Sequence, residues 1–174
     1  MLTSSKRHTI RGADKSVVQI DYTEIREAAA ADGKTSLALA IYERFGKRST
    51  DAPAFLKRAR WVFAPDPAHM VDTSAEAVEE YVMVDQELHS FVMDGEHYVG
   101  RPIGVIESGP AKQVAMHTYS QVKQLGLPAF YTVSMPERVY QRIMFPFITA
   151  GKVTHVVTLV HPLLSRRRLS EVLH

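Results

Sequence analysis

The chain has 174 residues, of which 45% are hydrophobic and 23% are charged, a composition typical of one globular domain. It contains no cysteine, which excludes disulfide scaffolds, thiolate metal sites and cysteine catalysis. The formal net charge of +2 conceals a partition: residues 1–60 hold 12 basic and 7 acidic side chains, residues 61–110 hold 1 and 10, and residues 111–174 hold 8 and 2. We expect these opposite charges to meet, within one fold or across a dimer.

The N-terminal sequence carries no sign of targeting or of a membrane segment. The basic start is not followed by the apolar stretch of about 7–15 residues that a signal peptide needs. No other stretch approaches the roughly 18 apolar residues needed to cross a bilayer. We therefore expect a cytoplasmic protein without membrane association. Residues 1–17 are polar and lack periodicity, which predicts a flexible arm.

Residues 18–63 are expected to form an N-terminal helical segment, with a possible first strand. The alanine-rich run from Tyr22 to Ala31 favours a helix, and Gly33 can end it. A second helical stretch runs from Leu37 to Phe45, and Asp51-Ala52-Pro53 is typical of a third helix start. The sequence Ala64-Pro65-Asp66-Pro67 must break whatever precedes it.

The second half favours strands around one long helix. Residues 80–85 form a short β-prone run, and residues 111–125 carry one continuous apolar stripe at helical spacing. Three strands follow at residues 129–135, 139–148 and 153–160, and the short connections between them favour antiparallel hairpins. A basic tail, residues 163–174, closes the chain. The fold class expected is α+β with an antiparallel sheet.

No residue pattern amounts to a catalytic or metal-binding signature. Gly33-Lys34-Thr35 resembles the end of a phosphate-binding loop, but Ala28 stands where that loop needs its first glycine, so a helix cap is the better interpretation. The histidines do not form a His-Glu-x-x-His frame, and no serine lies on a Gly-x-Ser-x-Gly turn. The acidic middle segment would oppose a polyanion, which argues against nucleic-acid binding by the basic tail. We predict no catalytic residue and no metal site.

Several motifs follow one another in a familiar order. They are Tyr81-Val82-Met83-Val84, the pair Gly100-Arg101, the helix end Gly126-Leu127-Pro128, Tyr140-Gln141-Arg142 with Pro146, and a β-branched run from Val153 to Val160. In this order and spacing they resemble the PAS sensory domains that occur as short, stand-alone proteobacterial proteins. Two positions depart from the family pattern: Asp85-Gln86 stands where a glycine is usual, and Leu127 where an arginine is usual.

The resemblance implies a PAS-like core at residues 64–162, with a five-stranded antiparallel sheet, helices packed on one face and the N-terminal helical segment as an addition. It implies a non-enzymatic sensory or protein-interaction module that binds a small ligand between sheet and helices. Such a module acts through a signalling partner or as a homodimer, for which helix 22–31 is the natural contact. The identity of the ligand and of any cofactor is left open. The ligand-binding candidates are Phe91, Met116, His117, Tyr131, Tyr140 and Met144. The alternative is a small α+β enzyme or ligand-binding protein with a pocket near His117 and His155.

Overall fold

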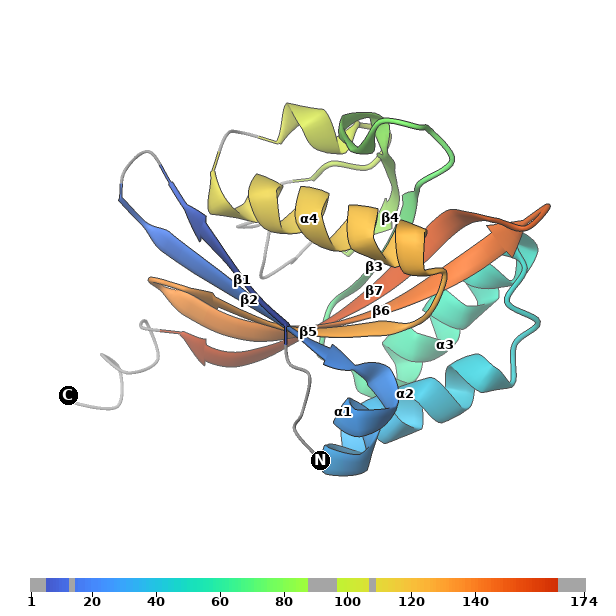
Figure 1. Cartoon of the computed structure of the whole chain (residues 1–174). Helices are drawn as coiled ribbons and strands as arrows, with labels where there is room; N and C mark the ends of the chain where they lie inside the picture. The colour runs from blue at the N-terminus through green and yellow to red at the C-terminus, as the bar shows by residue number, and fades with distance from the viewer. Residues whose placement is uncertain (1–5, 13–14, 88–96, 107–108, 166–174) are drawn as a thin grey trace.

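The fold is an α+β arrangement around a single antiparallel sheet (Figure 1). The computed structural model describes residues 6–12, 15–87, 97–106 and 109–165. Its strands are β1 (Lys6–Arg11), β2 (Val17–Glu24), β3 (Ala68–Asp72), β4 (Val82–Gln86), β5 (Ala129–Met135), β6 (Arg138–Thr149) and β7 (Lys152–Ser165). Its helices are α1 (Ile25–Ala31), α2 (Gly33–Glu43), α3 (Ala52–Phe63) and α4 (Pro110–Leu125), with short 3₁₀ turns η1 (Ser49–Asp51), η2 (Val78–Glu80) and η3 (Ile103–Val105). None of the helices in these ranges is long and apolar enough to span a bilayer.

The seven strands lie in the order β1-β2-β5-β6-β7-β3-β4, and every neighbouring pair is antiparallel. The hairpins β5–β6 and β6–β7 confirm the predicted connections. At the β6–β7 turn both central residues, Ala150 and Gly151, have positive φ angles of 48° and 77°, as the favoured two-residue hairpin turn requires. In the strand order given above, the last three strands of the chain, β5, β6 and β7, form the middle of the sheet.

Helices cover both faces of the sheet, whereas the sequence predicted helices packed on one face. α4 lies across one face, and α1, α2 and α3 cover the other (Figure 1). The physical reason is visible in β6, which has apolar side chains on both of its sides: Tyr140 and Met144 point to one helical layer, and Phe145 and Phe147 to the other. Such a strand has no face that can be left to water.

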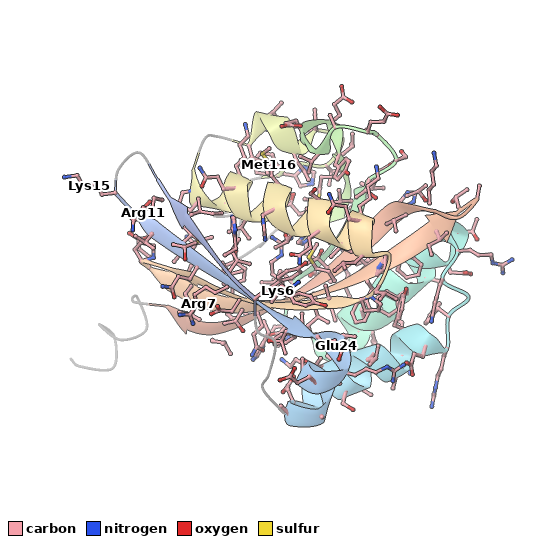
Figure 2. The ribbon with its side chains drawn as sticks, viewed as in Figure 1. Lys6, Arg7, Arg11, Lys15, Glu24 and Met116 are labelled. Carbon is pink, nitrogen blue, oxygen red and sulfur yellow. The ribbon has the colours of Figure 1, made fainter. Side chains whose placement is uncertain are left out.

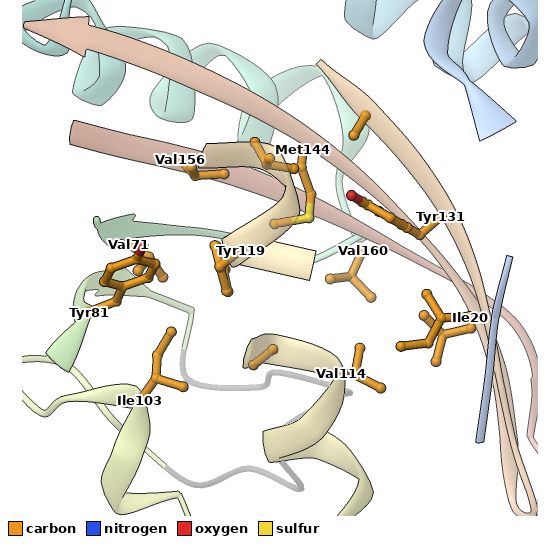
Figure 3. Close-up of a cluster of buried hydrophobic side chains, with 14 of the residues drawn as sticks. Ile20, Val71, Tyr81, Ile103, Val114, Tyr119, Tyr131, Met144, Val156 and Val160 are labelled. Carbon is orange, nitrogen blue, oxygen red and sulfur yellow. The ribbon is translucent and has the colours of Figure 1, made fainter. Parts of the chain in front are cut away.

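Each face has its own apolar core. The first core lies under α4, and its most buried members include Val18, Ile20, Val71, Val114, Tyr119, Val122, Tyr131, Val133, Tyr140, Met144, Val156 and Val160 (Figure 3). The second core lies under α1–α3 and includes Ile25, Ala38, Tyr42, Ala52, Phe55, Leu56, Ala59, Met70, Phe130, Ile143, Phe145, Phe147, Val157 and Leu159.

The N-terminal part differs from the sequence prediction. Residues 6–11, for which the sequence suggested a flexible arm, form β1 and pair with β2. The first helix begins at Ile25 rather than Tyr22, because residues 22–24 continue β2 along β5. Within residues 18–63, where the sequence left room for a first strand, β2 occupies residues 17–24, and the next strand, β3, begins only at Ala68. Residues 166–174 of the predicted basic tail lie outside the described residues.

Candidate functional site

A wide groove that is open to solvent lies beside α4 and has a volume of about 710 Å³. Two of the predicted ligand-binding residues, Met116 and His117, line it, and Figure 2 labels Met116 on α4. The groove is lined by His8, Ile10, Val78, Gln113, Met116, His117, Ser120, Gln121 and Gln124. The α4 residues in this set recur every three or four positions, so they form a face next to the buried stripe of the same helix. Most of them are polar but uncharged, which suits a ligand held by hydrogen bonds and apolar contact.

Two histidines join β1 to α4 at this groove. The rings of His8 and His117 stack in parallel, with centroids 4.1 Å apart and planes inclined by 7°. Partial burial lowers the pKa of His117, and the nearby His8 lowers it further. Stacked rings carry their lone pairs in parallel planes and do not converge on a shared ion. Among the described residues no group of three or more histidine or acidic side chains could hold a metal ion.

The other predicted ligand-binding residues lie deeper. Tyr131, Tyr140 and Met144 are fully buried in the first core and do not line the groove. Figure 3 shows Tyr131 and Met144 within this core. One hydrogen bond connects the first core to the groove. The Tyr131 hydroxyl donates to Gln121 Oε1 at 3.2 Å, and Gln121 lines the groove. Phe91 lies outside the described residues.

A polar cluster in the first core was not predicted. The Tyr119 hydroxyl lies 2.7 Å from His69 Nε2 and 3.1 Å from Thr158 Oγ1. The guanidinium of Arg142 lies 5.2 Å from the centroid of the Tyr119 ring, and the Arg142 side chain is 3% exposed. This buried polar cluster (His69, Tyr119, Tyr131, Tyr140, Arg142 and Thr158) lies between α4 and the strands β5, β6, β7 and β3. Cross-strand pairing places Tyr131 and Val160 on either side of Arg142.

Burial and the Arg142 charge together set the protonation of this cluster. Burial lowers the pKa of His69 to about 3, and the charges of Arg142 and Arg60 contribute to that change. Burial raises the pKa of Tyr119 and Tyr131, and raises that of Tyr140 to about 12, although Arg142 opposes the rise in all three. Near neutral pH the cluster therefore consists of one cation surrounded by neutral hydroxyl and imidazole groups.

His117 and His155 are not brought together. His155 lies opposite Phe147 in the β6–β7 register, and Phe147 belongs to the second core. His155 therefore faces the α1–α3 side, whereas His117 lies on α4 beyond the other face. The Nδ1 atom of His155 lies 3.3 Å from the hydroxyl of its neighbour Thr154. A shared pocket for these two histidines, the alternative drawn from the sequence, has no support in this arrangement.

The segment resembling a phosphate-binding loop has a structural role. Asp32 caps α2 by accepting from the Thr35 backbone N–H at 2.8 Å and from its hydroxyl at 2.6 Å. Lys34 donates to Asp66 and lies 2.8 Å from His161 Nδ1, which itself lies 2.8 Å from Asp66 Oδ2. These contacts tie α2 to the loop before β3 and to β7.

Among the residues at the groove and beneath it, the sequence predicted Met116, His117, Tyr131, Tyr140 and Met144 as ligand-binding residues, whereas Gln121, His69 and Arg142 were not among the predicted ones. A signal for Arg142 was available, because Tyr140, Arg142 and Met144 alternate along one strand and must share a face. Compared with known protein families, with curated proteins and with solved structures, the chain matches none.

Proposed function

We propose that this chain is a PAS-like sensory or protein-interaction module. It binds a small ligand between the sheet and α4, and it transmits binding through a partner or a second copy without catalysing a reaction. The module works in the cytoplasm.

The order of the strands supports this proposal most strongly. β5-β6-β7-β3-β4 form a contiguous five-stranded antiparallel block, to which β1 and β2 are added at the β5 edge. Along the chain, two strands are followed by η3, α4 and three hairpin-linked strands, which is the element order of the resemblance. Helices α1–α3 are the additional N-terminal segment.

The motif residues occupy positions that fit the same proposal. Tyr140 and Arg142 both lie in the buried region under α4, where a ligand between sheet and helix would reach them. Gly126 ends α4 with a φ of 63°, the left-handed conformation that glycine favours at a helix C-terminus. The groove beside α4 adjoins this region, because Gln121 lines the groove and accepts a hydrogen bond from the buried Tyr131.

Ligand binding can be tested with the purified chain. Native mass spectrometry should show a co-purifying small molecule, or a thermal-shift screen should find compounds that raise the melting temperature. Ser120→Phe, which fills the groove, should abolish the effect, whereas Leu37→Phe at an exposed position of α2 should preserve it. The ligand-binding part of the proposal is wrong if no compound binds, or if both variants bind as the parent chain does.

Association can be tested separately by light scattering at low and high salt. We expect a homodimer or a complex with a signalling partner, and α1 is the candidate contact. A monomer at both salt concentrations, together with failure to pull down a partner from the native host, would contradict this part of the proposal.

A further inference from the structure

The strongest clue to the ligand is Arg142, a buried cation. Its side chain is 3% exposed, and none of the ion pairs in the described part of the chain includes it. Its Nε atom has no hydrogen-bond partner there. A buried charge is costly unless an opposite charge and hydrogen bonds compensate it. The fold thus keeps a desolvated guanidinium whose compensating anion is not among the described side chains.

The groups around Arg142 are suited to an anion. Tyr131 lies beside it on β5, and the ring of Tyr119 lies below its guanidinium. The neutral hydroxyls of the buried polar cluster can donate hydrogen bonds, and none of them supplies a negative charge near neutral pH. A guanidinium with adjacent hydroxyl donors matches the geometry of a carboxylate, which accepts two or more hydrogen bonds at once.

A single side chain, that of Gln121, lies between the solvent-filled groove and the buried polar cluster. Gln121 separates the groove from Tyr131, and its Oε1 holds the Tyr131 hydroxyl at 3.2 Å. Met144, two residues from Arg142 on the same face of β6, is a flexible side chain that can repack around an incoming group. The groove walls include Ile10, Val78 and Met116, which offer apolar contact to the body of a ligand.

We propose that the ligand is a small organic carboxylate with an apolar body, which lies in the groove and places its carboxylate on Arg142. The carboxylate replaces Gln121 as the acceptor for Tyr131 and supplies the charge that the cluster lacks. This inference rests on the proposed ligand-binding function and specifies its chemistry.

The experiment uses matched probes that differ in charge. Hexanoate, octanoate and phenylacetate are each compared with the corresponding primary amide by isothermal titration calorimetry and thermal shift. At least one carboxylate should bind at least about tenfold more tightly than its amide, as expected for a hydrogen-bonded charge pair. Arg142→Met should remove this preference, whereas Lys152→Met, which removes one exposed positive charge, should keep it.

Two further readouts separate binding from a purely structural role. The ligand-free Arg142→Met variant should melt at or above the temperature of the parent chain, because a buried cation that has no ion-pair partner among the described residues is replaced by an apolar side chain of similar length. If that variant does not fold, Tyr131→Phe serves in its place, and it should weaken carboxylate binding by about tenfold.

The inference is overturned if every carboxylate binds no better than its amide, or if the folded Arg142→Met variant retains the preference. If uncharged compounds still bind in a manner abolished by Ser120→Phe, the proposed function stands and only the ligand class is wrong. If nothing binds in the groove, the ligand-binding part of the proposed function fails as well.

Discussion

The imidazole of His69 is buried beneath Tyr119, where burial first, and then the charges of Arg142 and Arg60, lower its pKa to about 3. In the unfolded chain the same group has a pKa near 6.5. Between these two values the unfolded chain binds a proton that the folded chain does not. The free energy of unfolding should therefore decrease as the pH falls through this window, by up to about 1.4 kcal/mol per pH unit from this group.

His69→Gln should remove this pH dependence. When the pH is lowered from 6.5 to 4, the free energy of unfolding of the variant should decrease less steeply than that of the parent chain. Urea denaturation at a series of pH values measures the difference. Thr158→Val removes a hydroxyl from the same cluster without removing a titratable group. It should lower stability equally at each pH, and an unchanged slope in His69→Gln would contradict the assignment.

At Asp32 a single carboxylate sets the start of α2. Asp32→Ala removes the acceptor for the Thr35 N–H and should lower the free energy of unfolding by about 1 kcal/mol. Asp32→Asn keeps an acceptor oxygen and should recover most of that loss in the same urea titration. Equal losses in the two variants would show that the charge, rather than the cap, is what matters.

At the scale of single elements, two glycines on helix termini make a matched pair. Gly126 follows α4 with a φ of 63°, and Gly33 is the first residue of α2, and a Cβ at either position would meet no atom within 4 Å. Gly126→Ala should lower stability by about 1 kcal/mol, because the left-handed conformation is unfavourable for a residue with a Cβ. Gly33→Ala should be neutral or stabilising, because alanine favours the helix. Thermal melts should therefore show a lower melting temperature for Gly126→Ala and an unchanged or higher one for Gly33→Ala, and an equal decrease in both would contradict the backbone argument.

The elements that the sequence predicted well are those whose pattern is local. The apolar stripe of α4 and its terminal glycine lie within one stretch of chain, and the alternation in β5 is equally self-contained. β3 has only five residues, and four of them are buried, so it shows no alternation that could have identified it. β1 is mostly polar and exposed, and only its pairing with β2 makes it a strand.

The same limit applies to the candidate site. Alternation along β6 predicts that Tyr140 and Arg142 share a face, but not that this face is sealed from water. The burial of Arg142 depends on α4 above it and on neighbouring strands, which come from distant parts of the chain. The meeting of His69 with Tyr119, 50 residues apart, likewise follows from the tertiary fold and not from spacing.

Across the whole molecule, the acidic and basic segments meet within one fold, which was one of the two arrangements expected from the charge partition. Arg60 on α3 donates to the Ala68 carbonyl at 2.8 Å and to Asp85 on β4 at 2.9 Å. Lys34 pairs with Asp66 on the same side of the sheet. Basic residues of the N-terminal helices thus hold the acidic β3–β4 edge.

Arg60→Ala should therefore loosen the β3–β4 edge and cost about 2 kcal/mol of unfolding free energy, because a charged donor is lost from a partly buried site. Arg58→Ala on the same helix removes an exposed guanidinium 4.7 Å from the Trp61 ring and should cost less than half as much. Hydrogen exchange should show faster exchange in β4 for Arg60→Ala only. Equal effects of the two variants would mean that Arg60 does not anchor this edge.

At the opposite border of the sheet, β1 presents the exposed side chains of Lys6, Arg7 and Arg11 (Figure 2). Behind it lies β2, which is much more apolar and places Val18 and Ile20 in the first core. An outer strand rich in positive charge discourages another chain from adding to the sheet, because each added copy would bring like charges together. β1 therefore protects the fold against aggregation. Cleavage in the β1–β2 turn followed by loss of β1 would leave the backbone N–H and C=O groups of β2 unpaired, and a second chain could pair with them.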